Sequence, residues 1–407
     1  MKTTLTEAAT APILENLRKS NAVFARRYPG LSPRRQPVHT VYGGAQVFKA
    51  NSAGRLGALA LRALEEYAPD AALLAGALGL PEALAPKIYE RVVGKLRREP
   101  VEDFRIDFED GYGNRPDPEE DGHAVQAARE VASGMAAGTL PPSIGIRIKP
   151  LTEELARRSL RTLDLFVTEL VGAAGRLPEN FVVTLPKVTL PEQVWALADV
   201  FDRLESGLKL PGGALRLELM IETPQSILGE QGEVNVLRLV EAARGRCGSA
   251  HFGTYDYTAS LQITAAHQHM AHAACDFARH AMQVALAGTG VWLSDGATNI
   301  LPVPIHRGAP GGPPLSAAQV RENRDAVHAA WRLHYGHVRR SLEHAYYQGW
   351  DLHPAQLPTR YAALYSFFLE GLEAASARLK NFVEKAGQAT LIGEVFDDAA
   401  TGQGLLN

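Results

Sequence analysis

Charged residues alternate with apolar residues in three short segments of this 407-residue chain. The segments are FRIDFED at 104–110, GIRIKP at 145–150 and LRLELMIE at 215–222. Successive side chains of a strand point to opposite faces, so each segment has one apolar and one charged face. Parallel strands that are covered on both sides are usually apolar throughout. The charged faces therefore point away from the covering helices, into an interior where charges must pair with one another, with a metal or with a charged ligand.

The charges divide into a group within the strands and a group at the strand ends. For the first group the favoured interpretation is an internal salt-bridge network of Arg105, Asp107, Arg216 and Glu218. The second group lies where a barrel opens to its ligand-binding loops. Its members are Glu109, Asp110, Arg147, Lys187, Glu222 and Asp256.

Glu222 and Asp256 are the two carboxylates whose spacing could do chemistry. They end successive predicted strands, in MIETP and FGTYDY, so we expect them to be neighbours. Two carboxylates without nearby histidines suit a hard cation such as Mg²⁺, which leaves positions for water and substrate. The alternative is a general acid and base pair, as in glycosidases. Arg147 on the adjoining rim favours an anionic ligand, because a guanidinium pairs bidentately with a carboxylate.

Eight strand patterns alternate with helical patterns along the chain. Repeated alternation predicts parallel strands with crossover helices, and eight units fit a (β/α)8 TIM barrel better than an open sheet. No GxGxxG follows the first strand, which argues against a dinucleotide-binding fold. The predicted strands are Pro37–Tyr42, Phe104–Asp110, Ile144–Ile148, Phe181–Lys187, Leu215–Glu222, His251–Asp256 and Val291–Ser294, with a weaker eighth before His353. The predicted helices include Arg55–Tyr67, Pro81–Arg98, Glu120–Ala136, Thr152–Gly172 and Pro191–Leu204.

Three parts of the chain are predicted. Residues 1–36 form a basic, helical N-terminal extension that caps the barrel or contacts another subunit, residues 37–358 form the barrel, and residues 359–407 form a C-terminal helical segment. Within the barrel, residues 308–348 open with the loop sequence GAPGGPP and continue as a long helix over Val320–His344. We interpret this stretch as an insertion.

Composition excludes several classes of protein. The 42 basic and 45 acidic residues give a formal net charge of -3, and no basic patch with interleaved aromatic residues is present, so neither nucleic acid nor a membrane is expected as a partner. Only Cys247 and Cys275 are present, without a CxxC, which argues against a disulfide framework and a zinc site. The chain shows no signal peptide and no run of about 18 apolar residues, which predicts a soluble cytoplasmic protein.

Six motifs, taken in order, resemble those of the citrate lyase β-subunit-like lyases. These belong to the same superfamily as malyl-CoA lyase and the class II pyruvate aldolases. RIDFEDG resembles the DLED-type segment of that family, GIRIKP its VRIN strand and TLPKV its LPK strand. MIETP is similar to the IET or CETP strand, FGTYDYT to the GxxDL strand and DLHPAQLP to the IHPSQI segment. The resemblance covers roughly residues 37–358 and implies the same barrel fold.

The resemblance implies a role for each matching residue. Glu222 and Asp256 would hold Mg²⁺, with Mn²⁺ as an alternative. Arg147 would bind the oxygens of a 2-oxo acid and stabilise its enolate, with Gly253 and Thr254 as further substrate-binding residues. The remaining catalytic residues would be an acidic group that orders metal-bound water and Arg147, and one further positive group: Asp107, Glu109, Asp110 and Lys187.

The implied activity is the cleavage or formation of a carbon–carbon bond next to an enolisable 2-oxo acid or acyl-CoA. Negative charge would develop on an enolate oxygen, where a divalent cation and Arg147 would lower the barrier. A malate-synthase-like condensation or a thioester hydrolysis at the same metal site is an alternative, and a non-catalytic binding or scaffold barrel is another. The expected partners are a 2-oxo acid, a hydroxy acid or a CoA thioester, and further copies of the chain in a homo-oligomer.

Several other residues have more than one interpretation. Asp295 is a general base or, by slight preference, a turn residue in an Asp-Gly pair. The loop over 111–123 contributes Arg115 or His123 to the site or, as we favour, begins a helix with its acidic residues. Structural positions are expected for the histidines: a core position for His39, a turn for His353, and a polar helix surface for His267, His269 and His272.

Overall fold

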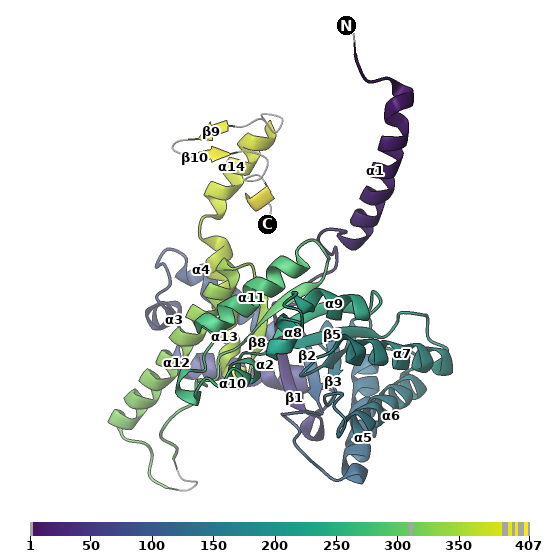
Figure 1. Cartoon of the computed structure of the whole chain (residues 1–407). Coiled ribbons are helices and arrows are strands. Elements are labelled where there is room, and N and C mark those ends of the chain that lie inside the picture. The colour runs from purple at the N-terminus through teal and green to yellow at the C-terminus, as the bar shows by residue number, and fades with distance from the viewer. Residues whose placement is uncertain (1–2, 309–311, 385–389, 393–394, 398–402, 406–407) are drawn as a thin grey trace.

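Eight parallel strands close into a barrel in chain order, and the last strand pairs with the first. The computed structural model describes residues 3–308, 312–384, 390–392, 395–397 and 403–405. The strands are β1 (His39–Gly44), β2 (Asp103–Asp107), β3 (Ser143–Arg147), β4 (Phe181–Leu185), β5 (Arg216–Ile221), β6 (Cys247–Phe252), β7 (Trp292–Ala297) and β8 (Gln348–Asp351). The predicted (β/α)8 barrel is confirmed, including its weakest strand, β8 (Figure 1).

Helices cover the outside of the barrel and join one strand to the next. Those between β1 and β7 are α2 (Ser52–Tyr67), α3 (Ala71–Leu78), α4 (Ala85–Arg98), α5 (Asp117–Ala137), α6 (Ala156–Ala174), α7 (Pro191–Leu208), α8 (Pro224–Ile227), α9 (Asn235–Ala242), α10 (Thr254–Ser260) and α11 (Ala273–Leu286). The long α12 (Ala317–Glu343) lies between β7 and β8, in the place of the seventh crossover helix. Helices α13 (Leu357–Leu369) and α14 (Leu372–Glu384) follow β8, and a small antiparallel sheet is formed by β9 (Thr390–Ile392) and β10 (Val395–Asp397).

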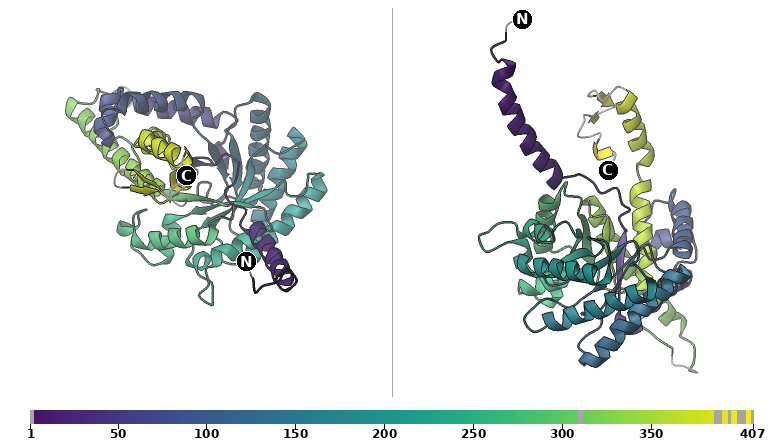
Figure 2. Two further views of the ribbon diagram at one scale, coloured as in Figure 1. Left: turned by 90° about the horizontal axis from the view of Figure 1, so that it is seen from above. Right: turned by 90° about the vertical axis from the view of Figure 1, so that its right-hand side faces the viewer.

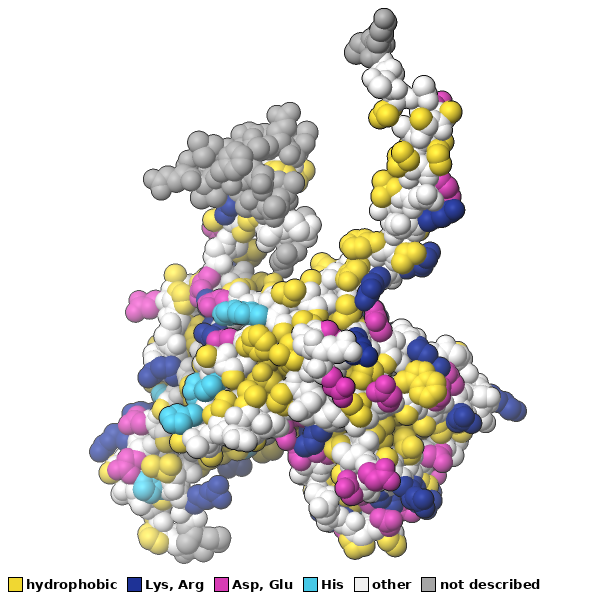
Figure 3. All heavy atoms as spheres, viewed as in Figure 1, with side chains coloured by type: hydrophobic (Ala, Val, Ile, Leu, Met, Phe, Trp, Pro, Cys, Tyr) yellow, Lys and Arg dark blue, Asp and Glu magenta, His cyan; other side chains and the backbone are white. Residues whose placement is uncertain are grey.

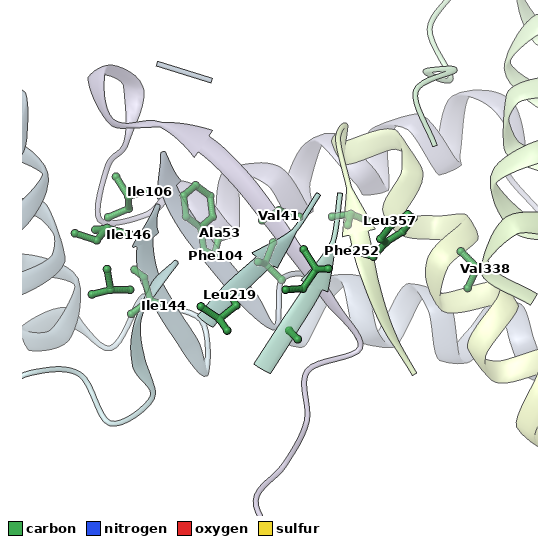
Figure 4. Close-up of a cluster of buried hydrophobic side chains, with 14 of the residues drawn as sticks. Val41, Ala53, Phe104, Ile106, Ile144, Ile146, Leu219, Phe252, Val338 and Leu357 are labelled. Atoms are coloured by element: carbon green, nitrogen blue, oxygen red, sulfur yellow. The ribbon is translucent and has the colours of Figure 1, made fainter. Parts of the chain in front are cut away.

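The outward faces of the strands form the main core (Figure 4). Ile106 on β2 and Ile146 on β3 are fully buried, and Phe104 packs against Phe48 with ring centroids 5.3 Å apart. Burying each of these side chains contributes about 1.5–3 kcal/mol. The alternation in FRIDFED and GIRIKP therefore sets the apolar side chains against the helices, and the charged side chains between them point into the barrel.

Five predicted strands run past their observed C-terminal ends, by one or two residues in β3, β4 and β5 and by more in β2 and β6. Strand β2 ends at Asp107, whose carboxylate accepts hydrogen bonds from the backbone N–H groups of Glu109 (3.0 Å) and Gly111 (2.7 Å) and so turns the chain. Strand β6 ends at Phe252, and Asp256 lies in the first turn of α10. The sequence pattern missed this helix because only seven residues form it.

The acidic stretch after β2 begins a helix, as we favoured. Asp117, Glu119 and Glu120 lie in the first turn of α5, where they complement the positive end of the helix dipole. Arg115 forms an ion pair with Glu119 at 2.5 Å, and the ring of His123 lies 2.8 Å from the hydroxyl of Tyr112. Arg115 and His123 therefore contact residues of their own loop and helix, and these contacts do not involve the residues predicted for the site.

The N-terminal extension consists of a helix and a connecting segment. Helix α1 (Glu7–Arg27) buries none of its residues and projects from the end of the barrel where the strands begin, as does α14 (Figures 1 and 2). Apolar side chains lie open along α1, among them Ile13, Leu17 and Phe24 (Figure 3). The connecting segment then reaches β1 and places Arg35 2.6 Å from Glu102. In the described part of the chain, no helix has both the length and the apolar character needed to span a membrane.

Candidate active site

Inward-pointing side chains form two charged layers inside the barrel. The lower layer lies toward the beginnings of the strands and contains Asp103, Arg105, Glu218 and His251. The upper layer lies at the C-terminal mouth and contains Asp107, Glu109, Asp110, Arg147, Lys187, Glu222 and Asp256.

The lower layer is a closed network. Arg105 donates to Glu218 Oε2 at 2.6 Å and also pairs with Asp103. The Glu218 carboxylate accepts from the hydroxyls of Thr184 (2.6 Å) and Ser249 (2.8 Å). Burial would raise the pKa of Glu218, but Arg105 and His251, the latter 2.9 Å away, hold it well below its usual range. Glu218 is therefore ionised and fully satisfied by its own chain.

This arrangement corrects the predicted salt-bridge network. Arg105 and Glu218 pair as expected, but Asp107 and Arg216 belong elsewhere. Asp107 ends β2 directly beside Arg147 in the register of β3, so it bonds that arginine. Arg216 is the first residue of β5 and lies at the N-terminal end of the barrel. It borders the same cavity as Asp103 and Glu218 but, within the described residues, forms no ion pair with them.

Arg147 is the central cation of the upper layer. Its Nε and Nη2 donate to the two oxygens of Asp107 at 2.7 and 2.5 Å, and its Nη1 lies 3.1 Å from Glu109 Oε2. The guanidinium lies 4.8 Å from the ring centroid of Tyr42 and 5.7 Å from that of Trp350. Burial lowers the pKa of Arg147, but Asp107 and Glu109 raise it by more than burial lowers it. The net pKa is above the usual value, so Arg147 stays charged. The carboxylates of Asp107 and Glu109 and the ring of Tyr42 together fix the orientation of the guanidinium group.

Lys187 bridges the acidic side chains across the mouth. Its Nζ contacts Glu109 and lies 3.1 Å from Asp110 and 3.5 Å from Asp256. Its backbone has φ 50, a left-handed conformation that is uncommon for a residue other than glycine. This conformation accompanies a hydrogen bond of 2.7 Å from the Lys187 N–H to Glu222 Oε1. The lysine thus contacts one carboxylate with its backbone and three with its side chain.

Glu222 is a buried carboxyl group opposite a glycine. Burial raises its pKa to about 8, Lys187 opposes this shift, and Asp256 adds to it. A Cβ at Gly253 would lie 2.5 Å from both Cβ and Oε2 of Glu222, so position 253 accepts only glycine. The side chain of Asp256 is 40% exposed, and it reaches the same lysine from α10. The structure therefore brings Glu222 and Asp256 together around Lys187, although they come from different kinds of element.

The donors of the upper layer fit a magnesium ion in their chemistry. Within the described residues, no group of three or more His, Cys, Asp or Glu side chains is arranged to hold a metal. Mg²⁺, however, commonly takes only one or two protein carboxylates and keeps several waters. The ammonium of Lys187 lies 3.5 Å from Asp256, and its charge lowers the pKa of Glu222 against the effect of burial. Asp256 thus already contacts a cation here, and the charge of that cation also acts on Glu222.

Two aromatic residues that sequence reasoning missed face the same interior. The hydroxyl of Tyr42 and the indole Nε1 of Trp350 are buried and, within the described residues, have no hydrogen-bond partner. Their rings lie 4.4 Å apart beside Arg147. The alternation in HTVYGG could have shown Tyr42, because Val41 packs outward. Thr254 also has a buried, unpartnered hydroxyl, which lies against Gly296 of β7.

Asp295 and the histidines lie outside this site. Asp295 is a buried residue of β7, not a turn residue, and it bonds Arg279 (3.0 Å) and the hydroxyl of Ser341 (2.6 Å) between the barrel and its helices. His39 is in the core, as expected: its Nε2 accepts the backbone N–H of Glu102, so its Nδ1 donates to Asp351 at 2.8 Å. His353 caps a short 3-10 helix, as expected. His267 is exposed at the end of a short 3-10 helix, His269 lies in a bend and His272 caps α11, so the three histidines do not share the predicted helix surface.

The chain belongs to the family described as a domain of unknown function, DUF6986, which matches residues 17–407. No curated protein matches the chain. Among solved structures, it is similar to a citrate lyase from Burkholderia xenovorans LB400, with a TM-score of 0.60 and 16% identity over 94% of this chain and 92% of that one. This similarity confirms, for the fold, the predicted resemblance to the citrate lyase-like proteins.

Two further structures are similar at lower TM-scores. One is the Haloferax volcanii malate synthase in a magnesium and glyoxylate complex, with a TM-score of 0.49 and 15% identity over 82% of this chain and 76% of that one. The other is the protein CitE from Mycobacterium tuberculosis with magnesium, acetoacetate and coenzyme A, with a TM-score of 0.49 and 13% identity over 90% of this chain and 95% of that one.

Proposed function

We propose that this chain makes or breaks a carbon–carbon bond next to an enolisable 2-oxo acid or acyl thioester. The observation that carries the proposal is the upper layer, where Arg147 and Lys187 are held among carboxylates. That layer lies at the C-terminal mouth, where TIM barrels place their active sites. The fold shared with a citrate lyase supports the same assignment.

Arg147 would stabilise the negative charge of the enolate. Because Asp107 holds two of its nitrogens and the ring of Tyr42 lies beside it, the guanidinium is oriented before a substrate arrives. Preorganised charges of this kind need no rearrangement during the reaction. Lys187, whose side chain is 28% exposed, would contact the carboxylate of the substrate.

Glu222 and Asp256 would hold Mg²⁺ or Mn²⁺, which supplies Lewis-acid stabilisation of the enolate oxygen when bound. Lys187 would remain neutralised by Glu109 and Asp110, which it already contacts. Gly253, which lets the chain pass close against Glu222, and Thr254 at the start of α10 would contact the substrate.

The unpartnered donors of Tyr42 and Trp350 would bind substrate oxygens. Each is a buried N–H or O–H group, and leaving such a group without an acceptor costs about 1–3 kcal/mol. A carboxylate or keto oxygen next to Arg147 would accept from both. The two aromatic residues would therefore orient the substrate without changing its charge.

The chain would form a homo-oligomer through α1. The supporting observation is the set of apolar side chains on this helix, of which Ile13 is 65% and Phe24 63% exposed. Size-exclusion chromatography with light scattering tests this assignment. The Phe24→Asp variant should have a lower molar mass than the wild-type assembly. A wild-type monomer would contradict it.

Deuterium exchange followed by proton NMR tests the activity without knowledge of the second substrate. The protein is mixed in heavy water with pyruvate, 2-oxobutyrate or acetyl-CoA, with Mg²⁺ or Mn²⁺ and with a chelator as the control. We expect metal-dependent loss of a C–H signal next to the carbonyl group: the methyl signal of pyruvate or acetyl-CoA, or the C3 methylene signal of 2-oxobutyrate. Asp256→Asn should abolish it, while Asp325→Asn, at an exposed position of α12, should not. If only acetyl-CoA exchanges, acyl-CoA condensation is favoured. If the protein neither binds metal nor catalyses exchange with any of the three compounds, a non-catalytic barrel is favoured.

A further inference from the structure

A small cavity lies at the N-terminal end of the barrel, opposite the upper layer. Its accessible volume is about 60 Å³, several times the roughly 10–15 Å³ that one water molecule needs. Its lining includes Arg34 from the segment that connects α1 to β1, Arg216 from β5, Gly248 and Ser249 from β6, and Trp292 from β7. The cavity thus joins the N-terminal extension to the barrel.

Two guanidinium groups converge in this cavity. Arg34 lies over Trp292, with its Cζ 4.7 Å from the ring centroid. A Cβ at Gly248 would lie 3.4 Å from Arg34 Nη2 and 3.8 Å from Arg216 Nη2, so both nitrogens border the same space. Gly248 is also the extra residue of a β-bulge, because the register passes from Leu217 opposite Cys247 to Glu218 opposite Ser249. The bulge and the missing side chain together open this space.

Neither of these arginines is neutralised by the part of the chain that the structure describes. Three carboxylates also line the cavity. Asp103 and Glu218 are both bound to Arg105, and the exposed Glu179 forms no ion pair with Arg34 or Arg216. Arg216 Nε is buried without a hydrogen-bond partner. Burial and then the charge of Arg216 lower the pKa of Arg34, and no carboxylate opposes this shift. Two like charges that border one small space repel each other unless an anion lies between them.

We propose that Arg34 and Arg216 bind a small oxyanion, a phosphate or carboxylate group, over Gly248. A planar guanidinium group pairs with a phosphate or a carboxylate through two parallel N–H donors. The ring of Trp292 orients the guanidinium group of Arg34. The accessible volume admits the head group of one such ligand. Because Arg34 belongs to the connecting segment, the bound anion fastens the N-terminal extension to the barrel. The site is independent of the activity proposed for the upper layer.

Calorimetric titration of the full chain with inorganic phosphate, and separately with malonate at equal ionic strength, tests the proposal. We expect saturable binding that weakens at least tenfold in Arg34→Gln and in Arg216→Gln. Arg203→Gln is the matched control, because Arg203 is exposed on α7 and does not line the cavity. Tighter binding of phosphate identifies a phosphoryl ligand and tighter binding of malonate a carboxylate, and both results support the site.

A steric variant separates the cavity from the charge of its arginines. Gly248→Ala keeps both guanidinium groups at ordinary contact distance but fills the space between them, so we expect phosphate binding to weaken severalfold with an unchanged Tm of the free protein. The absence of saturable binding of either anion to the wild type would overturn the proposal, as would equal affinity in Arg34→Gln. Arg34 is exposed, so we expect Arg34→Gln to fold. This variant therefore tests the anion site even if Arg216→Gln fails to fold. Deuterium exchange reports on the upper layer separately.

Discussion

The two charged layers use the same residue types inside the same barrel, and yet they differ in how their charges are satisfied. In the lower layer, Arg105 forms ion pairs with both Asp103 and Glu218, and each of the three side chains is at most 3% exposed. In the upper layer, the described residues supply five carboxyl groups but only two cations, Arg147 and Lys187. Two of these carboxyl groups, Asp110 and Asp256, are more than a third exposed. Both carboxylates of the lower layer are paired, although His251 Nε2 has no hydrogen-bond partner among the described residues. The upper layer has capacity for a further cation.

Position along the strand explains this difference. A side chain in the middle of a strand is surrounded by neighbouring strands, which supply partners such as Thr184 and Ser249 to Glu218. A side chain at the strand end meets loops and solvent, so its partners are fewer and can be exchanged for a ligand. Burial of a charge is therefore weak evidence of function by itself, and incomplete neutralisation at a mouth is stronger evidence.

The largest expected effect is a loss of stability in the lower layer. Glu218→Gln removes the charge that neutralises Arg105, and breaking a buried ion pair in this way costs about 3–5 kcal/mol. Urea unfolding followed by circular dichroism measures the change. Glu119→Gln, which removes an ion pair on the surface of α5, should cost less than about 1 kcal/mol. A loss equally small in Glu218→Gln would show that the lower layer is not the closed structural network described here.

The next effect is expected on activity in the upper layer. Arg147→Lys keeps the positive charge but loses the paired hydrogen bonds to Asp107, so deuterium exchange should slow about 100-fold. Rates at saturating pyruvate or acetyl-CoA give the measurement. Arg129→Lys, in an exposed ion pair with Glu169, should leave the rate unchanged. An Arg147→Lys protein that unfolds more readily yet exchanges at the wild-type rate would make the upper layer structural as well.

The barrel and much of the upper layer could be predicted from the sequence because they depend on periodicity. Alternation in three strands places their charges inside, and this holds for Asp107, Arg147 and Glu222. The pairing of Arg147 with Asp107 could not be predicted, since it depends on the register between β2 and β3. Arg216 was misplaced for the same reason: alternation gives the face of a residue but not its height in the barrel.

Smaller effects are expected where an unpartnered donor faces the site. Tyr42→Phe removes a buried hydroxyl that has no partner among the described residues, so the free protein should gain up to about 1 kcal/mol of stability while KM rises about tenfold. Tyr89→Phe is the contrasting variant, because its hydroxyl donates to the carbonyl of Pro69 at 2.7 Å and its loss should cost about 1 kcal/mol. Thermal unfolding and exchange kinetics measure both quantities. Unchanged kinetics in Tyr42→Phe would remove this residue from substrate binding.

The smallest effect is a pH dependence at the outer edge of the N-terminal end. Hydrogen bonding to Arg35 lowers the pKa of Glu99 to about 2, with a further contribution from Lys95. A carboxyl group with a lowered pKa in the folded state stabilises the protein above its unfolded pKa, near 4.5, and this contribution disappears as the pH falls toward 2. Because Arg35 is half exposed, solvent limits the effect to about 1 kcal/mol at most. The difference in Tm between the wild type and Glu99→Gln should therefore be constant above pH 5 and shrink below pH 4.5. A difference that grows as the pH falls would show that the Arg35 contact does not stabilise the folded connecting segment.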